Sequence, residues 1–267
     1  MRVLHLFAGA GGSHLTGELL GWESVGSVEI DPYCQRLLRQ HYPNEVIHGD
    51  IRTFQANHLA GVVDGVCGGF PCTDISAAGK GAGITGEHSG LWSEFARVIA
   101  ECRPGWAFIE NSPRLRSLGL DTVLQDLARI GYNAEWSTLS AAAIGAPHKR
   151  DRMWILATDP NRDWARQYTG AWNGQSRGES AGDNPWRMGK DGANAMLNGL
   201  QDNDPDSPVA WSAWLHVRRH PQPLLPRVGH GMAHRVDRIK AIGNGWVPQQ
   251  AAYAWLELAK RTLDTSP

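Results

Sequence analysis

Apolar runs of strand length alternate with amphipathic helical patterns over most of the first 158 residues. Continuous or alternating apolar stretches predict strands at 3–7, 24–30, 46–47, 62–67, 106–109, 134–139 and 153–157. Apolar residues at helical spacing predict helices at 13–21, 33–41, 89–102 and 121–130. Strands and helices that alternate in this way are typical of an α/β fold, here a Rossmann-like, doubly wound and mostly parallel sheet.

The pattern changes at residue 159. From there to about residue 208 the sequence is polar and rich in glycine and asparagine, and a helical pattern returns only after residue 244. A stretch of this length is long for a structureless loop, and its scattered tryptophans need somewhere to pack. A flexible linker remains the alternative. We therefore expect one domain made of 1–158 plus 243–264, and a small irregular domain over 159–242.

The composition is that of a globular protein, with 42% hydrophobic and 20% charged residues in a chain long enough to bury a large core. The apolar start at 3–7 is too short for a signal peptide or a membrane span, which predicts a cytoplasmic location. The four cysteines show no CxxC pair and no zinc-ligand spacing. Free thiols in a reducing compartment, and no bound metal, are therefore expected.

The net charge of -1 argues against a protein that coats nucleic acid. The basic residues are nevertheless unevenly distributed, because residues 213–240 hold six arginines and lysines against the single acid Asp237. This segment is a candidate phosphate-facing surface. A solvated basic face without a partner explains the same pattern.

A glycine-rich turn, Phe7–Gly12, joins the first predicted strand to the first helix. Glycines allow the backbone to approach a ligand closely. Glu29 ends the second strand and could accept hydrogen bonds from ribose hydroxyls, while Asp50 follows the third strand and could take an adenine amino group. No lysine or arginine follows the glycines and no Walker-type loop is present. The predicted ligand is a nucleoside without a pyrophosphate.

Cys72 lies on a Gly/Pro turn, Gly69–Thr73, directly after the strand predicted at 62–67. Open α/β sheets bind their ligands at the carboxyl ends of the strands, so a reactive thiol is expected at this place. For a cysteine considered alone, the alternative is a small buried side chain that fills a turn.

Two further motifs place charge at strand ends. Glu110 ends a strongly apolar strand, and desolvation in a cleft would raise the pKa of its carboxyl. The alternative is a solvated Glu110 beside a helix cap formed by Asn111 or Ser112. Arg150 and Arg152 alternate along the chain before the last strand, which predicts that both project to one face of an extended segment.

In order and spacing, these motifs resemble those of the DNA (cytosine-5)-methyltransferases, particularly their short phage and prophage members. The resemblance covers about 1–158 and 228–262 and is carried by Phe7–Gly12, Pro71-Cys72, Glu110-Asn111, Arg150-x-Arg152 and Gly243-Asn244. It implies a class I S-adenosylmethionine-dependent methyltransferase that acts on C5 of a flipped-out cytosine in double-stranded DNA and releases S-adenosylhomocysteine. A monomer in a bacterial or phage-infected host cell is expected, in restriction–modification or in protection of a phage genome.

The resemblance also implies roles for individual residues. Cys72 would attack C6 of the cytosine, and Glu110 would hold and transiently protonate its N3/N4 edge. Arg152 would contact O2 of the base, with Arg150 near the backbone. The cofactor would be surrounded by Phe7, Ala8, Gly9, Ala10, Gly11, Gly12, Glu29, Ile30, Asp50, Ile51, Pro71, Leu91 and Asn244.

The loop after Cys72 would close on DNA through Ser76 and Lys80, with its glycines as hinges. Residues 159–242 would form the target-recognition domain, in which DNA contacts are expected from Arg187, Arg218 and Arg219. Thr73 departs from the family, which usually has glutamine there, and Ile30 stands where an aromatic residue often stacks on the adenine.

The proposed chemistry needs these residue types. Cytosine C5 is a poor nucleophile, and addition of a thiolate to C6 makes C5 reactive, which splits one difficult step into two. A proton donor at N3 and a cation at O2 stabilise the electron density that this addition creates. Two alternatives remain, a tRNA cytosine-5 methyltransferase on the same framework and a non-catalytic nucleic-acid-binding homologue. The intact set of Cys72, Glu110 and Arg152 argues against the second.

Overall fold

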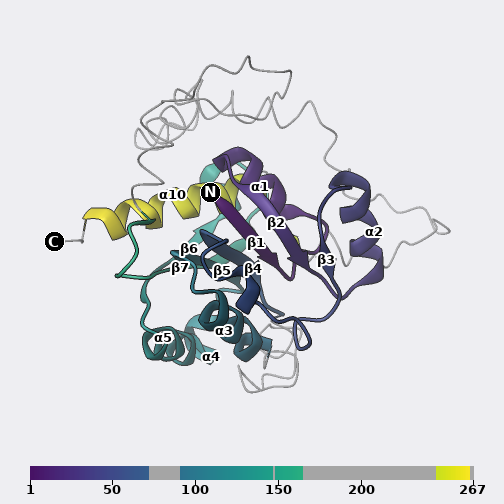
Figure 1. Ribbon diagram of the computed structural model, residues 1–267. Coiled ribbons are helices and arrows are strands. Elements are labelled where there is room, and N and C mark those ends of the chain that lie inside the picture. Colours follow the sequence, from purple (N-terminus) through teal and green to yellow (C-terminus); the bar gives the residue numbers. More distant parts are fainter. Residues whose placement is uncertain (72–90, 147, 165–244, 265–267) are drawn as a thin grey trace, which may run out of the picture.

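The computed structural model describes residues 1–71, 91–146, 148–164 and 245–264. In these ranges seven strands form one sheet with the order β3-β2-β1-β4-β5-β7-β6 (Figure 1). The parallel strands are β1 (Arg2–Leu6), β2 (Glu23–Val28), β3 (Ile47–His48), β4 (Gly65–Gly69) and β5 (Trp106–Asn111). β7 (Asp151–Thr158) runs antiparallel to both its neighbours, β5 and β6 (Asn133–Ser140).

Helices cover both faces of this sheet. α1 (Gly12–Leu20) and the carboxy-terminal α10 (Pro248–Asp264) pack together on one face, and α3 (Leu91–Cys102), α4 (Leu115–Leu118) and α5 (Leu120–Arg129) cover the other (Figure 1). α2 (Pro32–His41) follows β2, and two short 3-10 turns occur at Asn57–Leu59 and Ala141–Ile144. None of the helices in the described ranges is long and apolar enough to span a bilayer.

The side chains of β5 show how the sheet places a polar group at its edge. Ala107 and Ile109 pack into the apolar layer beneath α3 and α5, whereas Trp106 and Phe108 belong to the layer beneath α10. Successive side chains of a strand alternate between faces, so Glu110 follows Trp106 and Phe108 on the α10 face. The end of β5 therefore places a carboxylate next to a layer of aromatic side chains.

The predicted doubly wound, mostly parallel sheet is confirmed, and the differences lie at element ends. The strand predicted at 62–67 begins at Gly65 and continues to Gly69, and β3 begins after Val46, which is 60% exposed. The sequence did not predict α4. After β7 the chain continues to Trp164, which is buried in the same apolar layer as Trp255 of α10. The remainder of the region 159–242 lies outside the described residues.

Candidate active site

The glycine-rich turn after β1 is shaped by left-handed backbone and by Glu29. Phe7, Gly9 and Gly11 have φ of 51°, 56° and 90°. Glycine adopts such values readily, whereas Phe7 does so at a cost in strain. The Gly9 N–H donates to Oε2 of Glu29 at 2.7 Å, and the Asp31 N–H donates to Oε1 at 2.7 Å. Glu29, which was predicted as a ribose ligand, fixes the turn through these hydrogen bonds, a role that the sequence did not indicate.

An exposed apolar side chain lies directly beyond Glu29. Ile30, two residues after the end of β2, is 60% exposed. Pro71, after β4, and Leu91, at the start of α3, are half-buried. Exposed apolar surface next to a carboxylate suits a ligand with a flat apolar face and polar edges, such as a purine nucleoside.

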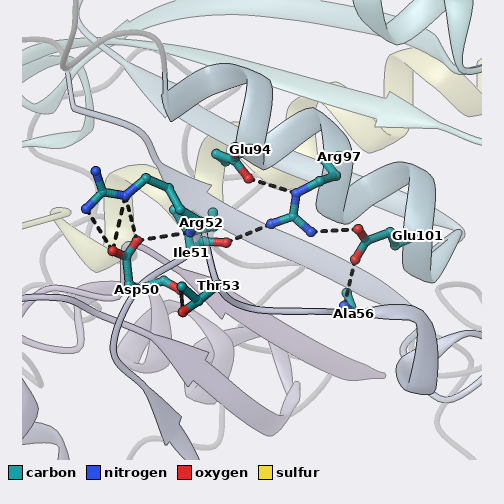
Figure 2. A network of polar contacts seen from close by, with 8 residues as sticks. All are labelled: Asp50, Ile51, Arg52, Thr53, Ala56, Glu94, Arg97 and Glu101. Carbon is teal, nitrogen blue, oxygen red and sulfur yellow. Dashed lines mark hydrogen bonds and ion pairs between the residues drawn. The ribbon is translucent and has the colours of Figure 1, made fainter.

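Asp50 and Ile51 lie in a polar network that ties the segment after β3 to α3 (Figure 2). Arg52 contacts both carboxylate oxygens of Asp50, with Nη2 at 2.7 Å from Oδ2, and these hydrogen bonds lower the pKa of Asp50. Arg97 donates to the Ile51 carbonyl at 2.7 Å and pairs with Glu94 and Glu101 of its own helix. Asp50 is therefore an ionised carboxylate paired with Arg52, and Arg97 fixes the adjacent backbone at Ile51.

Glu110 is the carboxylate of the predicted catalytic set, and it is buried. It is 9% exposed, and its Oε1 lies 2.7 Å from Nε of Arg152. Burial raises the pKa of Glu110, while the Arg152 and Arg150 guanidinium groups and the indole of Trp246 oppose that rise. In the sheet, Glu110 pairs with Gly69, the last residue of β4. The alternative of a solvated Glu110 is wrong.

The predicted extended geometry at Arg150 is also wrong. Its φ is 34°, in the left-handed region, and β7 begins only at the next residue. The Arg150 guanidinium donates to the carbonyl of Gly245, and the Arg150 carbonyl accepts a hydrogen bond from Nε2 of Gln250 at 2.9 Å. Burial, and then the neighbouring Arg152, lower the pKa of Arg150. A turn held by the carboxy-terminal segment, rather than strand alternation, brings both arginines near Glu110.

Asn111 anchors the chain where it leaves β4. Its Nδ2 donates to the carbonyl of Phe70 at 3.1 Å, while its Oδ1 accepts from the Ser112 N–H at 2.7 Å. Phe70 and Asn111 are both buried. The first described range ends at Pro71, one residue before Cys72. The turn that leads into Cys72 is therefore held at the same edge of the sheet as Glu110.

Several predicted site residues lie outside the described residues: Cys72, Ser76, Lys80, Arg187, Arg218, Arg219 and Asn244. Among the described residues, no group of three or more His, Cys, Asp and Glu side chains is arranged to hold a metal ion.

Sequence reasoning missed Trp246. Its indole nitrogen lies close to Gly69 together with Oε2 of Glu110, and hydrogen bonding from the indole lowers the pKa of Glu110. The indole ring stands edge-to-face against Phe108 and Trp154, at centroid distances of 5.7 and 5.1 Å. The one signal in the sequence is the position of Trp246 just after the Gly243-Asn244 motif.

The strand order with its single reversed strand defines the Rossmann-like class I fold of S-adenosylmethionine-dependent methyltransferases. The chain belongs to the C-5 cytosine-specific DNA methylase family, whose model matches residues 1–209. It is 35% identical over 158 residues to the Type II methyltransferase M.CviJI of Paramecium bursaria Chlorella virus IL3A, covering 58% of this chain and 42% of that protein. It is 37% identical over 160 residues to the Type II methyltransferase M.PspPI of Psychrobacter sp. (strain TA137), covering 58% and 38%.

Among solved structures, the chain resembles DNMT2 of Spodoptera frugiperda, with a TM-score of 0.52 and 17% identity over 61% of this chain and 51% of that one. At this identity the likeness shows the fold alone. The match covers less than half of the length of the two Type II methyltransferases named above.

Proposed function

We propose that this chain is a DNA cytosine-5 methyltransferase that uses S-adenosylmethionine and forms a covalent bond between Cys72 and C6 of a flipped-out cytosine. One observation carries the proposal. A buried carboxylate, Glu110, is held by Arg152 at 2.7 Å at the end of β5, and it pairs with Gly69 of the strand that leads into Cys72. Membership of the cytosine-specific methylase family supports the same reaction.

The residues around the glycine turn fit the proposed cofactor. Glu29 and Asp50 are acceptors for ribose hydroxyls and an adenine amino group, and the exposed Ile30 offers an apolar contact for the purine. Phe7, Ala8, Gly9, Ala10, Gly11 and Gly12 would line the turn, and Ile51, Pro71, Leu91 and Asn244 would complete the site. S-adenosylmethionine supplies the electrophilic methyl group when it is bound.

The chain's own residues would handle the base. The Cys72 thiolate adds to C6, and Glu110 holds the N3/N4 edge and carries a proton at N3. Arg152 stabilises charge at O2, with Arg150 nearby. After methylation, water accepts the proton from C5, the C5–C6 double bond re-forms as the Cys72 thiolate leaves, and N3 returns its proton to Glu110. Because C6 is stacked inside a duplex, the base must first leave the helix.

Double-stranded DNA is the proposed substrate. Residues 159–242 would form the target-recognition domain with Arg187, Arg218 and Arg219 as contacts, and Ser76 and Lys80 would contact DNA from the loop after Cys72. We further propose that the enzyme acts as a monomer, without a metal ion, in the cytoplasm of a bacterial or phage-infected host cell.

The first test measures transfer of a labelled methyl group to duplex DNA and, in parallel, to bulk tRNA. We expect transfer to duplex DNA by the wild type and none by Cys72→Ala. A variant at a buried thiol, Cys34→Ser, is a control for the loss of a sulfur elsewhere. Transfer to tRNA alone would contradict the proposal and favour the tRNA methyltransferase.

The second test traps the covalent bond on DNA that contains 5-fluorocytosine, from which the C5 substituent cannot leave as a proton. Wild-type protein should form an adduct that survives denaturing electrophoresis, whereas Cys72→Ala should form none. A wild-type protein that methylates DNA without forming an adduct would rule out the covalent mechanism. Bisulfite sequencing of DNA from an expressing host would give the recognised sequence.

A further inference from the structure

The segment Gly245–Gln250 contacts both the glycine turn predicted to bind the cofactor and the arginines predicted to bind the base. At the cofactor turn, a Cβ atom on Gly12 would lie 2.9 Å from the backbone nitrogen of Trp246, so these two backbones are in close contact. At the base pocket, the Gly245 carbonyl accepts from Arg150, and the fully buried Gln250 side chain donates to the Arg150 carbonyl at 2.9 Å. Trp246 lies between these two sets of contacts.

The indole of Trp246 lies near the carboxylate oxygen of Glu110 that Arg152 does not hold. Arg152 holds Oε1, whereas Oε2 and the indole nitrogen both lie close to Gly69. A methyl group on Gly69 would overlap Oε2 and would lie 3.1 Å from the indole nitrogen. The carboxylate is therefore held by a cation at one oxygen and by a neutral donor near the other.

The orientation of this indole is itself fixed by packing. Its ring meets Phe108 and Trp154 at interplanar angles of 89° and 88°, and those two rings stack on each other at 5.1 Å. Edge-to-face and stacked arrangements are the favoured geometries of aromatic pairs. Because Phe108 and Trp154 are fully buried, the indole N–H has a defined direction.

We propose that Trp246 is a positioning residue, whose indole N–H fixes the plane of the Glu110 carboxylate so that its remaining lone pairs face the target base. The inference rests on the proposed function, because it treats Glu110 as the group that holds cytosine. Two donors on different sides of one carboxylate restrict its rotation more than a single ion pair does.

The test compares Trp246→Phe, which keeps a ring but lacks the N–H, with Trp154→Phe in the same aromatic cluster. The Trp154 indole N–H has no hydrogen-bond partner among the described residues, so Trp154→Phe alters the packing around Trp246 without removing a hydrogen bond. The Glu110 side chain is titrated by carbon-13 NMR in protein with labelled glutamate, and its signal is assigned with Glu110→Gln. Circular dichroism checks that both variants fold.

A donor to a carboxylate stabilises its ionised form. Trp246→Phe should therefore raise the pKa of Glu110 by about one unit and lower kcat about tenfold. The dissociation constant for S-adenosylmethionine should not change, since only the side chain is altered. An unchanged pKa of Glu110 in Trp246→Phe, or an equal shift in Trp154→Phe, would overturn the inference.

A second measurement uses the wild type and does not depend on how the variants fold. The Trp246 indole N–H signal should shift with the titration of Glu110, and this dependence should vanish in Glu110→Gln. An indole signal that does not respond to pH would overturn the inference. If both titrations behave as expected but the wild type methylates neither DNA nor RNA, the positioning contact stands and the proposed function fails.

Discussion

At the scale of single residues, Glu110 balances opposing influences on one carboxyl. Burial raises its pKa, and this effect outweighs the neighbouring guanidinium groups of Arg152 and Arg150 and the Trp246 indole. A carboxyl with a raised pKa holds its proton to a higher pH than an exposed glutamate does. That property suits a group that must carry a proton at N3 of a base near neutral pH.

Glu110→Gln tests this role. The amide can still hydrogen-bond but cannot transfer a proton, so kcat for methyl transfer should fall by about 10²–10⁴-fold. The dissociation constant for S-adenosylmethionine, measured by calorimetry, should stay within about twofold, because Glu29 rather than Glu110 holds the glycine turn. A variant that keeps near-wild-type kcat would exclude proton transfer by Glu110.

The buried thiols should differ from Cys72 in reactivity. Burial raises the pKa of Cys102 to about 12 and that of Cys67 further. Because the thiolate is the reactive form, neither should react with iodoacetamide at pH 8 in the native protein. Peptide mapping by mass spectrometry should find Cys72 alkylated first, with Cys67 and Cys102 modified only in denaturant. Native-state alkylation of Cys67 at a similar rate would contradict this prediction.

Glu110 could be predicted from its local sequence, whereas the residues that the carboxy-terminal segment brings to it could not. Glu110 was predicted because a local signal, an apolar strand that ends in a carboxylate, marks it. Trp246 and Gln250 carry no such signal, since their contacts with Glu110 and Arg150 arise only when the end of the chain returns to the sheet. The left-handed backbone of Arg150 was missed because it depends on that return as well.

At the scale of elements, three of the five residues of β4 are glycines, which allow its neighbours to pack closely against it. A side chain on Gly65 would overlap the Trp106 ring, one on Gly68 would overlap the Leu6 carbonyl, and one on Gly69 would overlap Oε2 of Glu110. Glycine weakens a strand through its backbone entropy. Here it gives the neighbouring strands room for Trp106 and Glu110, so the composition of β4 follows from close packing and from the position of the site.

Alanine substitutions at Gly68 and at Gly49 should differ in their effect on the free energy of unfolding. Gly68→Ala forces a methyl group against the backbone of β1, which cannot move aside as a flexible side chain could. We expect a loss of about 2 kcal/mol in the free energy of unfolding, measured with urea. Gly49→Ala is the matched control, because its methyl group would meet only Gln35 Nε2 at 3.7 Å. Equal stability of the two variants would show that the β1–β4 contact is not tight.

The sequence predicted the number and type of most elements but not the direction of β7. Apolar periodicity identifies a strand and says nothing about which way it runs. A usable signal was the short connection between Ser140 and Asp151, which is too short for the helical crossover that parallel neighbours need. The hairpin β6–β7 follows from that length, and it places Arg152 beside the end of β5.

At the scale of the whole molecule, a buried polar network lies between β1, α1 and β2. The His5 ring stacks on His14 at 3.9 Å, and its Nδ1 lies 3.0 Å from the Ser13 hydroxyl. His14 Nε2 in turn contacts Ser27 at 3.0 Å and Glu45 at 2.9 Å. Buried polar groups stabilise a fold only while they stay hydrogen-bonded, so this network should make stability depend on pH.

The sign of that dependence follows from two pKa shifts. Burial, and then His14, lower the pKa of His5 well below 6.5. Below about pH 6.5, His5 therefore binds a proton in the unfolded chain but not in the folded chain. The contribution of His5 to stability is lost as the pH falls below about 6.5. Burial alone would raise the pKa of Glu45, but hydrogen bonds from His14 and Ser27 lower it. Its contribution is lost as pH falls below about 4.5.

We therefore expect Tm to be nearly constant from about pH 8 to 7 and to fall as the pH is lowered from about 6.5 to 5, because protonation of His5 favours the unfolded chain at up to about 1.4 kcal/mol per pH unit. Calorimetric scans of the wild type and His5→Asn in matched buffers measure this. The variant lacks the titrating group, so its Tm should be lower at pH 7 but should vary less between pH 6.5 and 5. Parallel pH profiles for the two proteins would assign the loss to another group and would show that His5 is protonated within the fold.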